Sequence, residues 1–404
     1  MRIGVVCSNR EVVGGTETYL RWLLPALAAR GHEVAAAFER EALSAQRALD
    51  RDMAGGERWT LPELGLARFK ARLLAFRPAV VYVHGLADAE LEAWLATHFR
   101  AVFYAHDFNG ACATGTRRHT IPTLGLCERS FGPACLAVNY LRGCGARRPD
   151  RLLRSYRAHQ DRSRVLQRYG AVAVASRHVR DVYARQGLSA ERLRLLPFPT
   201  LEWLPAETPP PRRPMGGKIL FAGRVTALKG LEHAVRAVAF AGRRLSRALT
   251  LTVAGEGPEL ARGLSLATEL GVNVQALGWV DGERKRRLFA ESDLLLVPSL
   301  WPEPFGVVGI EAGALGVPAV AYDVGGISDW LLPSESGELA RAFEFESLGE
   351  ALVRALRDPD HHAELVQGAW QVARRHSPER HMGALESILA SLAADERQPL
   401  ATPH

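Results

Sequence analysis

Short apolar runs alternate along the chain with longer segments in which apolar residues recur every three or four positions. In the first half, the runs RIGVVC, EVAAAF, AVVYVH, AVFYAH and AVAVAS are each continuous enough for a buried strand. Between the first two runs, Leu20, Leu23, Leu24 and Leu27 fall on one face of a helix that stops at Gly31. This alternation predicts α/β units built on a parallel sheet.

A proline-rich stretch interrupts the pattern, and a second α/β series follows it. Five of the ten residues in PAETPPPRRP (205–214) are proline, which stiffens the chain and removes backbone donors. The second series opens with GGKILFAG and continues with a helix whose apolar face holds Leu231, Ala234, Val235 and Val238. Its further strands are expected in ALTLTVAGEG, VNVQALGWV, DLLLVPS and PAVAYDV.

This pattern predicts four parts. They are an N-terminal Rossmann-like domain over residues 1–200, a proline-rich linker over 201–216, a C-terminal Rossmann-like domain over 217–375, and a C-terminal helix within 376–404. A length of 404 residues agrees with two domains. Ligands of such sheets bind at the carboxyl ends of the strands, so two domains facing a shared cleft are expected.

Composition and charge narrow the setting. The net charge of +7 is basic without demanding nucleic acid as a partner, and none is expected. Met1 leads directly into a strand, no secretory signal is visible, and no apolar run approaches the ~18 residues of a membrane span. We therefore expect a cytoplasmic protein, with a peripheral position at the inner face of the membrane as an option.

Two loops that follow strands of the second series carry the first candidate chemistry. In FAGRVTALKG, Arg224 and Lys229 flank a turn between a strand and a helix start, where cations and backbone N–H groups suit a diphosphate. The alternative is two solvated surface charges. In AGEGPEL, Gly255 and Gly257 match part of a dinucleotide fingerprint, but its third glycine is missing, and a tight turn at a strand end needs no ligand.

The stretch WPEPFGVVGIEAGALGVP places two glutamates in surroundings that are otherwise small, apolar or rich in glycine. Glu303 precedes a helix that we expect to begin near Phe305 or Gly306, where first-turn N–H groups lack partners within the helix. Glu311 lies about one turn beyond Val307, on roughly the same face. Acceptors on both sides of a row of donors suit a polyhydroxylated ligand. A charge at a helix N-terminus would explain Glu303, but a surface position does not explain Glu311 in so apolar a helix.

The order of these motifs resembles the nucleotide-sugar site of retaining glycosyltransferases of the GT-B fold, family 4 (group 1) type. The resemblance rests on Glu303 and Glu311 with GRVTALKG before them and DVGG after them, and on VVGGTETYL and YAHDF in the first half. It implies transfer of a sugar from a nucleoside diphosphate sugar to a glycan, lipid-linked or small-molecule acceptor, with retention and without a metal. It also implies an acceptor-binding first domain, a donor-binding second domain and a last helix that crosses back to the first.

The same resemblance assigns roles to the matching residues. It implies that Arg224 and Lys229 hold the diphosphate and stabilise the leaving nucleotide, and that His106, Arg224, Lys229 and Glu303 form the catalytic set. At the donor sugar, it implies contacts from Glu303 and from the backbone of Phe305, Gly306 and Val307, with His106 near the reacting carbon. In the nucleotide, it implies that Glu311 binds the ribose and that the backbone of Trp279 and Val280 binds the base. Gly14 and Gly15 are implied to lie at the phosphates and the acceptor.

Other functions stay open from the sequence. They are a sugar-nucleotide epimerase of the same fold, a dinucleotide-dependent oxidoreductase, and a non-catalytic binding protein. Asp358-Pro-Asp360 formally matches the Asp-x-Asp metal motif of GT-A-type transferases. It lies outside the strand-end loops, however, and its pattern favours a helix start over a metal site.

Four cysteines, Cys112, Cys127, Cys135 and Cys144, fall within one segment. Four thiolates can hold a structural zinc ion, but the segment has no Cys-x-x-Cys spacing. Zinc, disulfides and unbound thiols therefore all stay open.

A basic segment covers residues 142–168. Nine arginines stand there against Asp150 and Asp161, with Leu152, Tyr156 and Val165 among the apolar residues between them. Such a run is usually a solvated helix face. The sharper interpretation is contact with anionic lipid head groups or with an anionic acceptor.

Overall fold

The computed structural model describes the chain except for residues 45–46, 54, 212 and 396–404. It divides into two compact units, each built on one large sheet. The first unit comprises Met1–Thr116, Glu128–Pro197 and His381–His404, and the second comprises Arg117–Cys127 and Phe198–Arg380. The strands of each large sheet are parallel, so the predicted class of two Rossmann-like α/β domains is confirmed.

Seven strands form the sheet of the first unit. In spatial order they are β3 (Glu57–Thr60), β2 (Glu33–Arg40), β1 (Arg2–Asn9), β4 (Val80–His84), β5 (Ala101–Ala105), β8 (Ala171–Val174) and β9 (Leu193–Leu195). The five apolar runs fall on β1, β2, β4, β5 and β8, which are almost wholly buried because helices cover both faces.

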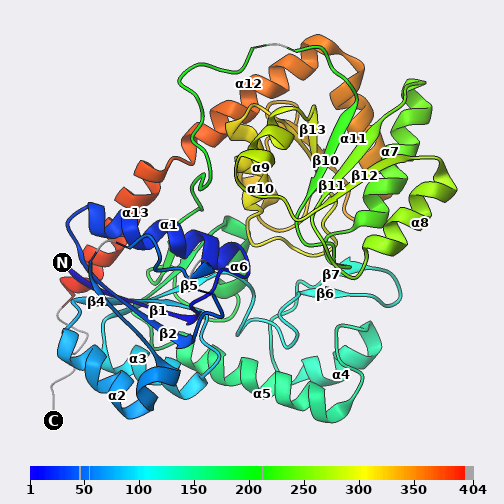
Figure 1. Cartoon of the computed structure of the whole chain (residues 1–404). Coiled ribbons are helices and arrows are strands. Elements are labelled where there is room, and N and C mark those ends of the chain that lie inside the picture. Colours follow the sequence, from blue (N-terminus) through cyan, green and yellow to red (C-terminus); the bar gives the residue numbers. More distant parts are fainter. Residues whose placement is uncertain (45–46, 54, 212, 396–404) are drawn as a thin grey trace. The chain divides into compact units, whose positions relative to one another are not determined.

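Helices lie on both faces of this sheet, with α1 and α13 on one side and α2, α3 and α5 on the other (Figure 1). Their bounds are α1 (Gly15–Ala29), α2 (Leu61–Phe76), α3 (Ala89–His98), α4 (Ala134–Arg142), α5 (Pro149–Leu166), α6 (Arg177–Ala184) and α13 (Pro378–Ala393). The predicted apolar face of α1 is confirmed, since Leu20, Leu23, Leu24 and Leu27 are buried. On the same helix, the hydroxyl of Tyr19 lies 2.8 Å from Nε2 of His381 in α13.

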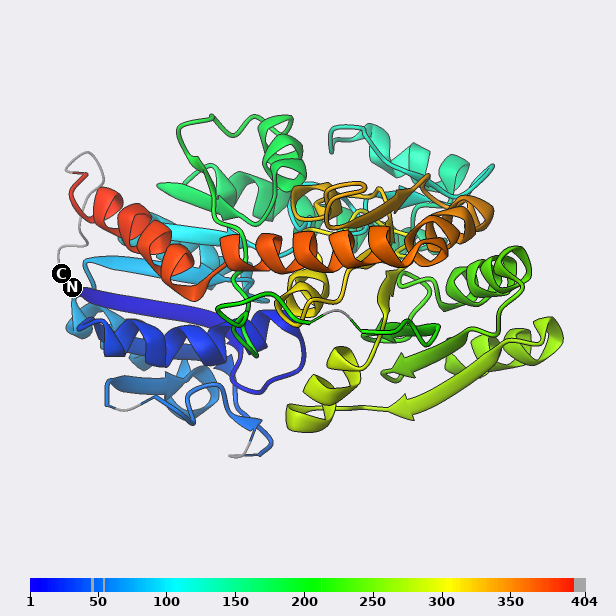
Figure 2. The ribbon, with the colours of Figure 1, turned by 90° about the horizontal axis from the view of Figure 1, so that it is seen from above.

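Six strands form the sheet of the second unit, in the order β12 (Asn273–Gly278), β11 (Thr250–Ala254), β10 (Lys218–Ala222), β13 (Leu294–Val297), β14 (Ala319–Tyr322) and β15 (Gly337–Ala340). β12 forms one edge, as Figure 2 shows. The strand order reverses between β10 and β13, so the loops that follow these two strands meet at the carboxyl edge. Open α/β sheets bind ligands at this point.

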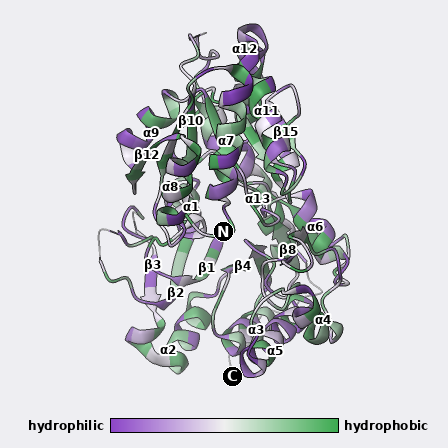
Figure 3. Cartoon of the chain, turned by 90° about the vertical axis from the view of Figure 1, so that its right-hand side faces the viewer, coloured by the Kyte–Doolittle hydropathy of each residue, from purple (hydrophilic) through white to green (hydrophobic). Residues whose placement is uncertain are grey.

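The helices of the second unit are α7 (Leu231–Leu245), α8 (Leu260–Leu270), α9 (Gly282–Ala290), α10 (Val307–Ala314), α11 (Phe345–Arg357) and α12 (Pro359–Arg375). Hydrophilic and hydrophobic colours alternate along the helices in Figure 3, as expected for elements with one buried side. The predicted face of α7 is buried at Leu231, Ala234, Val235 and Val238. Among the described helices, none combines the length and apolar character that a membrane-spanning segment needs.

A short hairpin from the first half of the chain belongs to the second unit. Its strands are β6 (Arg118–His119) and β7 (Gly125–Leu126), which pair antiparallel. Arg118 donates from Nη1 to the carbonyl of Leu300, 3.4 Å away, in the loop that follows β13. The hairpin thus reaches the edge at which the predicted donor-binding loops lie.

The proline-rich segment packs on the second unit. Trp370 of α12 donates from Nε1 to the carbonyl of Ala206 at 2.9 Å. Pro210 packs on Gly316, where φ is +70° and an added Cβ would lie 2.5 Å from Cγ of the proline. Arg213 donates to the backbone carbonyls of Ala290 and Ser292. Several residues of the expected linker are therefore anchored to one unit.

Candidate functional site

The loops after β10 and β13 are joined by an ion pair. Nζ of Lys229 lies 2.6 Å from Oε1 of Glu303, and the Glu303 side chain is only 5% exposed. The same oxygen accepts hydrogen bonds from the hydroxyl of Ser299 at 2.5 Å and from Nε1 of Trp301 at 3.0 Å. Nζ of Lys229 also lies 5.8 Å from the centre of the Trp301 ring. Two predicted site residues thus meet at the switch point of the sheet.

Glu303 is ionised in this setting. Its burial acts to raise the pKa, but the positive charge of Lys229 and the hydrogen bonds from Lys229, Ser299 and Trp301 outweigh burial and hold the pKa below its ordinary value. Among the described residues, every hydrogen bond to this carboxylate ends on Oε1. Oε2 is therefore the oxygen left to accept a bond from a ligand.

Arg224 lies on the same loop as Lys229 but is exposed, and its guanidinium has no ion pair with any described residue. The loop beneath it is tightly built. Val225 donates its N–H to the carbonyl of Glu256 at 2.8 Å, and Gly223 donates to the carbonyl of Ala254 at 2.9 Å. The arginine thus projects from a fixed backbone.

Gly255 and Gly257 explain this tight backbone. Both have positive φ, +150° and +155°, and an added Cβ would lie 1.9 Å from the carbonyl oxygen of Gly223 at the first and 2.2 Å from that of Val225 at the second. The partial dinucleotide fingerprint is thus needed for packing against the neighbouring loop. This supports its interpretation as a turn that needs no ligand.

The helix that carries Glu311 begins at Val307, directly after Gly306, whose φ is +89°. Trp330 holds this start, donating from Nε1 to the carbonyl of Phe305 at 2.6 Å. A Cβ added to Gly309 would lie only 2.0 Å from a ring carbon of Trp330. Gly306 is the position whose backbone favours glycine, and Gly309 makes room for Trp330.

Gly325 has a comparable structural cause. Its φ is +65°, and an added Cβ would lie 2.2 Å from the carbonyl oxygen of Glu303. Gly326 donates its N–H to that same oxygen at 2.6 Å. The DVGG loop therefore fixes the backbone of Glu303, and the close approach that its glycines permit is to this backbone.

Glu311 is paired with a residue that the sequence analysis missed. It is buried, and its Oε2 lies 3.3 Å from Nζ of Lys285 in α9. That ammonium also contacts Glu202 at 2.8 Å and lies over the Trp203 ring. Burial raises the pKa of Glu311, and repulsion from Glu202 also raises it, whereas the positive charge of Lys285 lowers it.

Trp279 and Val280 lie between β12 and α9. The Trp279 side chain is 68% exposed, and its backbone N–H donates to Oε1 of Glu256 at 3.3 Å. The exposed Trp279 ring thus lies next to the backbone at which the nucleotide base is predicted to bind.

His106, Gly14 and Gly15 belong to the first unit. His106 follows β5, and its Nε2 lies 2.9 Å from Nδ1 of His84 at the end of β4. Burial lowers the pKa of His106 to about 3. Gly14 and Gly15 begin α1, where an added Cβ would meet nothing closer than 3.5 Å. Packing gives no reason for glycine at these two positions, and their role at the phosphates stays a prediction.

The two candidate metal sites gain no support. Among the described residues, no three His, Cys, Asp or Glu side chains are grouped as a metal ion requires, and no disulfide joins any two cysteines. Asp358 is the N-cap of α12 and accepts the N–H of Asp360 at 2.9 Å, so the predicted helix start is confirmed.

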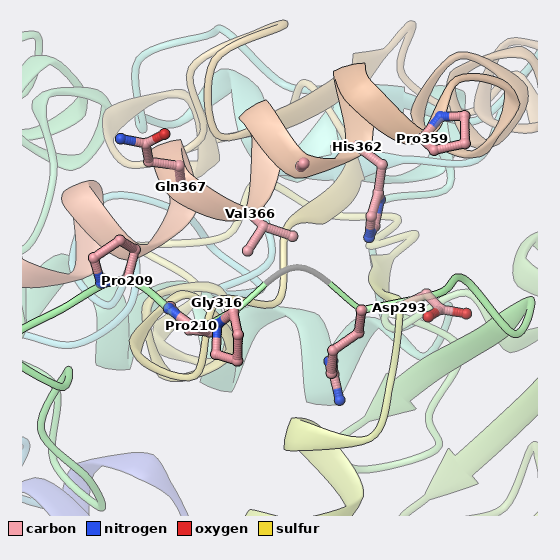
Figure 4. Close-up of a pocket in the computed structure, with 11 residues that line it drawn as sticks. Pro209, Pro210, Asp293, Gly316, Pro359, His362, Val366 and Gln367 are labelled. Atoms are coloured by element: carbon pink, nitrogen blue, oxygen red, sulfur yellow. The ribbon is translucent and has the colours of Figure 1, made fainter.

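A cavity of about 210 Å³ in the second unit lies apart from these residues (Figure 4). It is enclosed by Pro209 and Pro210 of the proline-rich segment and by His362 and Val366 of α12. Its carboxylate, Asp293, already accepts the backbone N–H of Lys218 at 2.8 Å. This hollow arises from the packing of the linker and includes none of the predicted site residues.

Two family models match the chain. The model described as Glycosyltransferase Family 4 matches residues 13–199, and the model described as Glycosyl transferases group 1 matches residues 209–372. The chain belongs to the glycosyltransferase family that these two models describe. The resemblance drawn from the motifs is thereby confirmed at the level of the family.

Curated relatives and solved structures agree with this family. An uncharacterised glycosyltransferase of Methanocaldococcus jannaschii is 35% identical over 30% of this chain and 33% of its own. A D-inositol 3-phosphate glycosyltransferase of Acidothermus cellulolyticus is 32% identical over 59% of each chain. The chain thus spans between a third and about three fifths of such relatives. The structure of Anabaena HepE in complex with UDP and glucose shares the fold, with a TM-score of 0.68, 17% identity and coverage of 97% of this chain and 100% of HepE.

Proposed function

We propose that the protein is a retaining glycosyltransferase that moves a sugar from a nucleoside diphosphate sugar to a hydroxyl of a glycan, lipid-linked or small-molecule acceptor. Membership of the family supports the reaction class. The UDP and glucose of the HepE complex support a nucleoside diphosphate donor. A setting in polysaccharide or glycoconjugate biosynthesis follows from these acceptor classes.

The proposal depends most on Glu303. Its Oε1 is held by Lys229, Ser299 and Trp301, and Oε2 remains for a ligand. A carboxylate whose pKa is lowered and which is fixed on one side is a good acceptor for sugar hydroxyls. It is a poor general acid, because it holds no proton near neutral pH. We therefore assign Glu303 to the hydroxyls of the donor sugar.

Arg224 and Lys229 would supply the electrostatic part of catalysis. In the transfer, the bond between the anomeric carbon and the diphosphate oxygen breaks, its electron pair stays on that oxygen, and the acceptor oxygen bonds to the same carbon. The acceptor proton passes to the leaving diphosphate or to water. An ammonium has three N–H donors, and Lys229 donates one of them to Glu303. The other two can bind a phosphate oxygen at the same time. Fixed cations that receive developing charge are usually worth ~10²–10³ in rate, and we expect transfer to need no metal.

The remaining assignments follow the same placement. Glu311 would accept the ribose hydroxyls, and the N–H groups at the start of α10, near Val307, would bind donor-sugar oxygens. Trp279 would lie at the base. The assignment of His106 to the donor sugar, and of Gly14 and Gly15 to the phosphates, follows the family resemblance.

One competing function loses its main support. A dinucleotide-dependent oxidoreductase would use its glycine fingerprint to approach a pyrophosphate. Here Gly255 and Gly257 are required for contact with the backbone of the loop that carries Arg224. An epimerase and a non-catalytic binding protein could share this fold. The products formed from donor and acceptor distinguish both of them from a transferase.

The experiment that tests this function uses donors and acceptors in two steps. Thermal unfolding with a panel of nucleoside diphosphate sugars should reveal the donor, because a bound ligand raises the melting temperature by mass action. That donor, incubated with candidate acceptors, should yield a nucleoside diphosphate and a glycoside whose anomeric configuration, read by NMR, equals that of the donor. An inverted product would refute retention, and an epimerised sugar without transfer would favour the epimerase.

We also propose that α4 and α5 contact an anionic membrane from the cytoplasmic side. The exposed residues Arg147, Arg151 and Arg157 carry no ion pair to described residues. Leu141 and Tyr140, near the end of α4, are 72% and 47% exposed. Arg162 is not part of this surface, because it forms a 2.8 Å pair with the buried Glu92. Basic residues beside exposed apolar ones are typical of peripheral membrane contacts.

Sedimentation with vesicles of phosphatidylcholine and phosphatidylserine tests the contact. Binding should require phosphatidylserine, fall with salt, and be lost when Arg151 and Arg157 are both changed to Glu. The matched control changes Arg243 and Arg244, exposed arginines of α7, to Glu, with the same change of net charge. Equal binding by the two variants, or none at low salt, would refute the proposal.

A further inference from the structure

Two histidines stand side by side at the carboxyl end of the first sheet. His84 is the last residue of β4, and His106 directly follows β5, the strand paired with it. Nδ1 of His84 and Nε2 of His106 are 2.9 Å apart. His84 is 1% exposed, and its ring centre lies 5.2 Å from that of His106.

The hydrogen bond between these rings holds one proton. Burial lowers the pKa of both imidazoles, so that each is neutral near neutral pH and carries one N–H. Two unprotonated nitrogens at this distance would repel each other, and two N–H groups would clash. One ring therefore donates and the other accepts.

The other nitrogen of His84 decides which ring donates. Nε2 of His84 is buried and has no hydrogen-bond partner among the described residues. If the proton between the rings came from His106, the N–H of His84 would be on this orphaned nitrogen, and buried N–H groups without a partner are rare. If His84 donates from Nδ1, only a lone pair is left there. The second arrangement is favoured, and it leaves the proton of His106 on Nδ1.

The polar groups of the neighbouring rings have hydrogen-bond partners of their own. His381 accepts from the Tyr19 hydroxyl at Nε2, because its Nδ1 donates to the carbonyl of Pro197 at 2.7 Å. The Tyr104 hydroxyl donates to the carbonyl of Leu196 at 2.8 Å. Tyr82 places its ring centre 4.2 Å from that of His84. The rings of Tyr19, Tyr82 and Tyr104 surround His84.

We propose that His84 is a positioning residue that fixes His106 in the tautomer with its proton on Nδ1. The N–H of His106 then lies on Nδ1, and its Nε2 is held by His84. A donor suits an oxygen of the donor sugar or of the leaving group. The use of this donor in transfer rests on the proposed function, whereas the tautomer itself does not.

The tautomer is tested on ligand-free protein by NMR of ¹⁵N-labelled histidine, with His106 assigned through its loss in His106→Gln. Nδ1 of His106 should be protonated and Nε2 should not. His84→Asn places an amide N–H where Nδ1 of His84 lies, and His106 should keep its proton on Nδ1. His84→Leu removes that N–H, and Nε2 of His106 should then become partly protonated. A proton on Nε2 of His106 in the unaltered protein would overturn the proposal, and this outcome does not depend on the folding of either His84 variant.

A kinetic measurement separates positioning from a purely structural role. With the donor found by thermal unfolding, His84→Leu should lower kcat about 10-fold with little change in KM, and His84→Asn should restore it to within about 3-fold. Equal losses in both variants would refute positioning by the N–H. Absence of transfer by the unaltered protein with every donor would refute the proposed function and would leave the tautomer result standing.

Discussion

Lys229 lies 2.6 Å from Glu303, and this ion pair joins the loop after β10 to the loop after β13. The pair stands where the strand order of the second sheet reverses, so a diphosphate held by the lysine and a sugar held by the glutamate would be neighbours. Under the proposed function, this geometry would couple leaving-group stabilisation to recognition of the donor sugar.

Lys229→Met should damage both catalysis and stability. The change removes a phosphate donor, and turnover should fall ~10²–10³-fold. It also leaves the buried carboxylate of Glu303 without its counter-ion, which should cost on the order of 2 kcal/mol of unfolding free energy, because Lys229 is itself partly exposed. Urea unfolding and steady-state kinetics measure the two effects, and an unaltered midpoint would contradict the pairing.

Arg224→Ala is the matched comparison. This arginine is exposed and has no ion pair with a described residue, so its loss should change the unfolding free energy by less than about 0.5 kcal/mol. Turnover should nevertheless fall ~10²–10³-fold, because a donor to the leaving diphosphate is lost. A variant that is both stable and fully active would remove Arg224 from the site.

Lys285→Met should raise the pKa of Glu311 further, because it removes the attraction that opposes burial. A carboxyl whose folded pKa lies above its unfolded pKa destabilises the fold progressively as pH rises past the ordinary value near 4.5. The stability lost by the variant relative to the unaltered protein should therefore grow from pH 4 toward pH 8. Glu202→Gln removes the carboxylate that repels Glu311, together with its ion pair to Lys285, and should lower the pKa of Glu311. Its stability relative to the unaltered protein should therefore improve from pH 4 toward pH 8.

Glu386→Gln tests the attachment of α13 to the first unit. The hydrogen bonds from Arg30, and then from His32, lower the pKa of Glu386 to about 2. A lowered carboxyl pKa contributes stability above its ordinary value of 4.5, which is lost as pH falls toward 2. The variant should melt below the unaltered protein at pH 6, and the difference should shrink at pH 3. A difference independent of pH would contradict this role.

The apolar pattern predicts the interior strands of both sheets but not β3, β9 and β15. All three are short strands at the edges of their sheets, where pairing depends on a neighbour more than on a continuous buried run. The hairpin of β6 and β7 carries no periodic signal, since each of its strands has two residues. The edge strand β12 was predicted, from VNVQALGWV, and it is the longest strand of its sheet, with six residues. The short edge strands are specified mainly by tertiary contacts.

The candidate site was predictable to the extent that its residues stand after strands. Glu303, Arg224 and Lys229 follow β13 and β10, and the topology brings their loops together. Lys285 was missed because it lies in a charged helix that reads as a solvated face, and its contact with Glu311 joins residues 26 positions apart. His84 was missed because one apolar run contains it, although strand pairing places it beside His106.

The most direct test of the central claim follows the donor itself. The nucleoside diphosphate sugar that most stabilises the protein is mixed with acceptor, and ³¹P NMR follows the diphosphate. The account predicts nucleoside diphosphate and a glycoside of unchanged anomeric configuration, formed ~10²–10³-fold more slowly by Arg224→Ala. An intact donor with every acceptor, or equal rates for the two proteins, would contradict it.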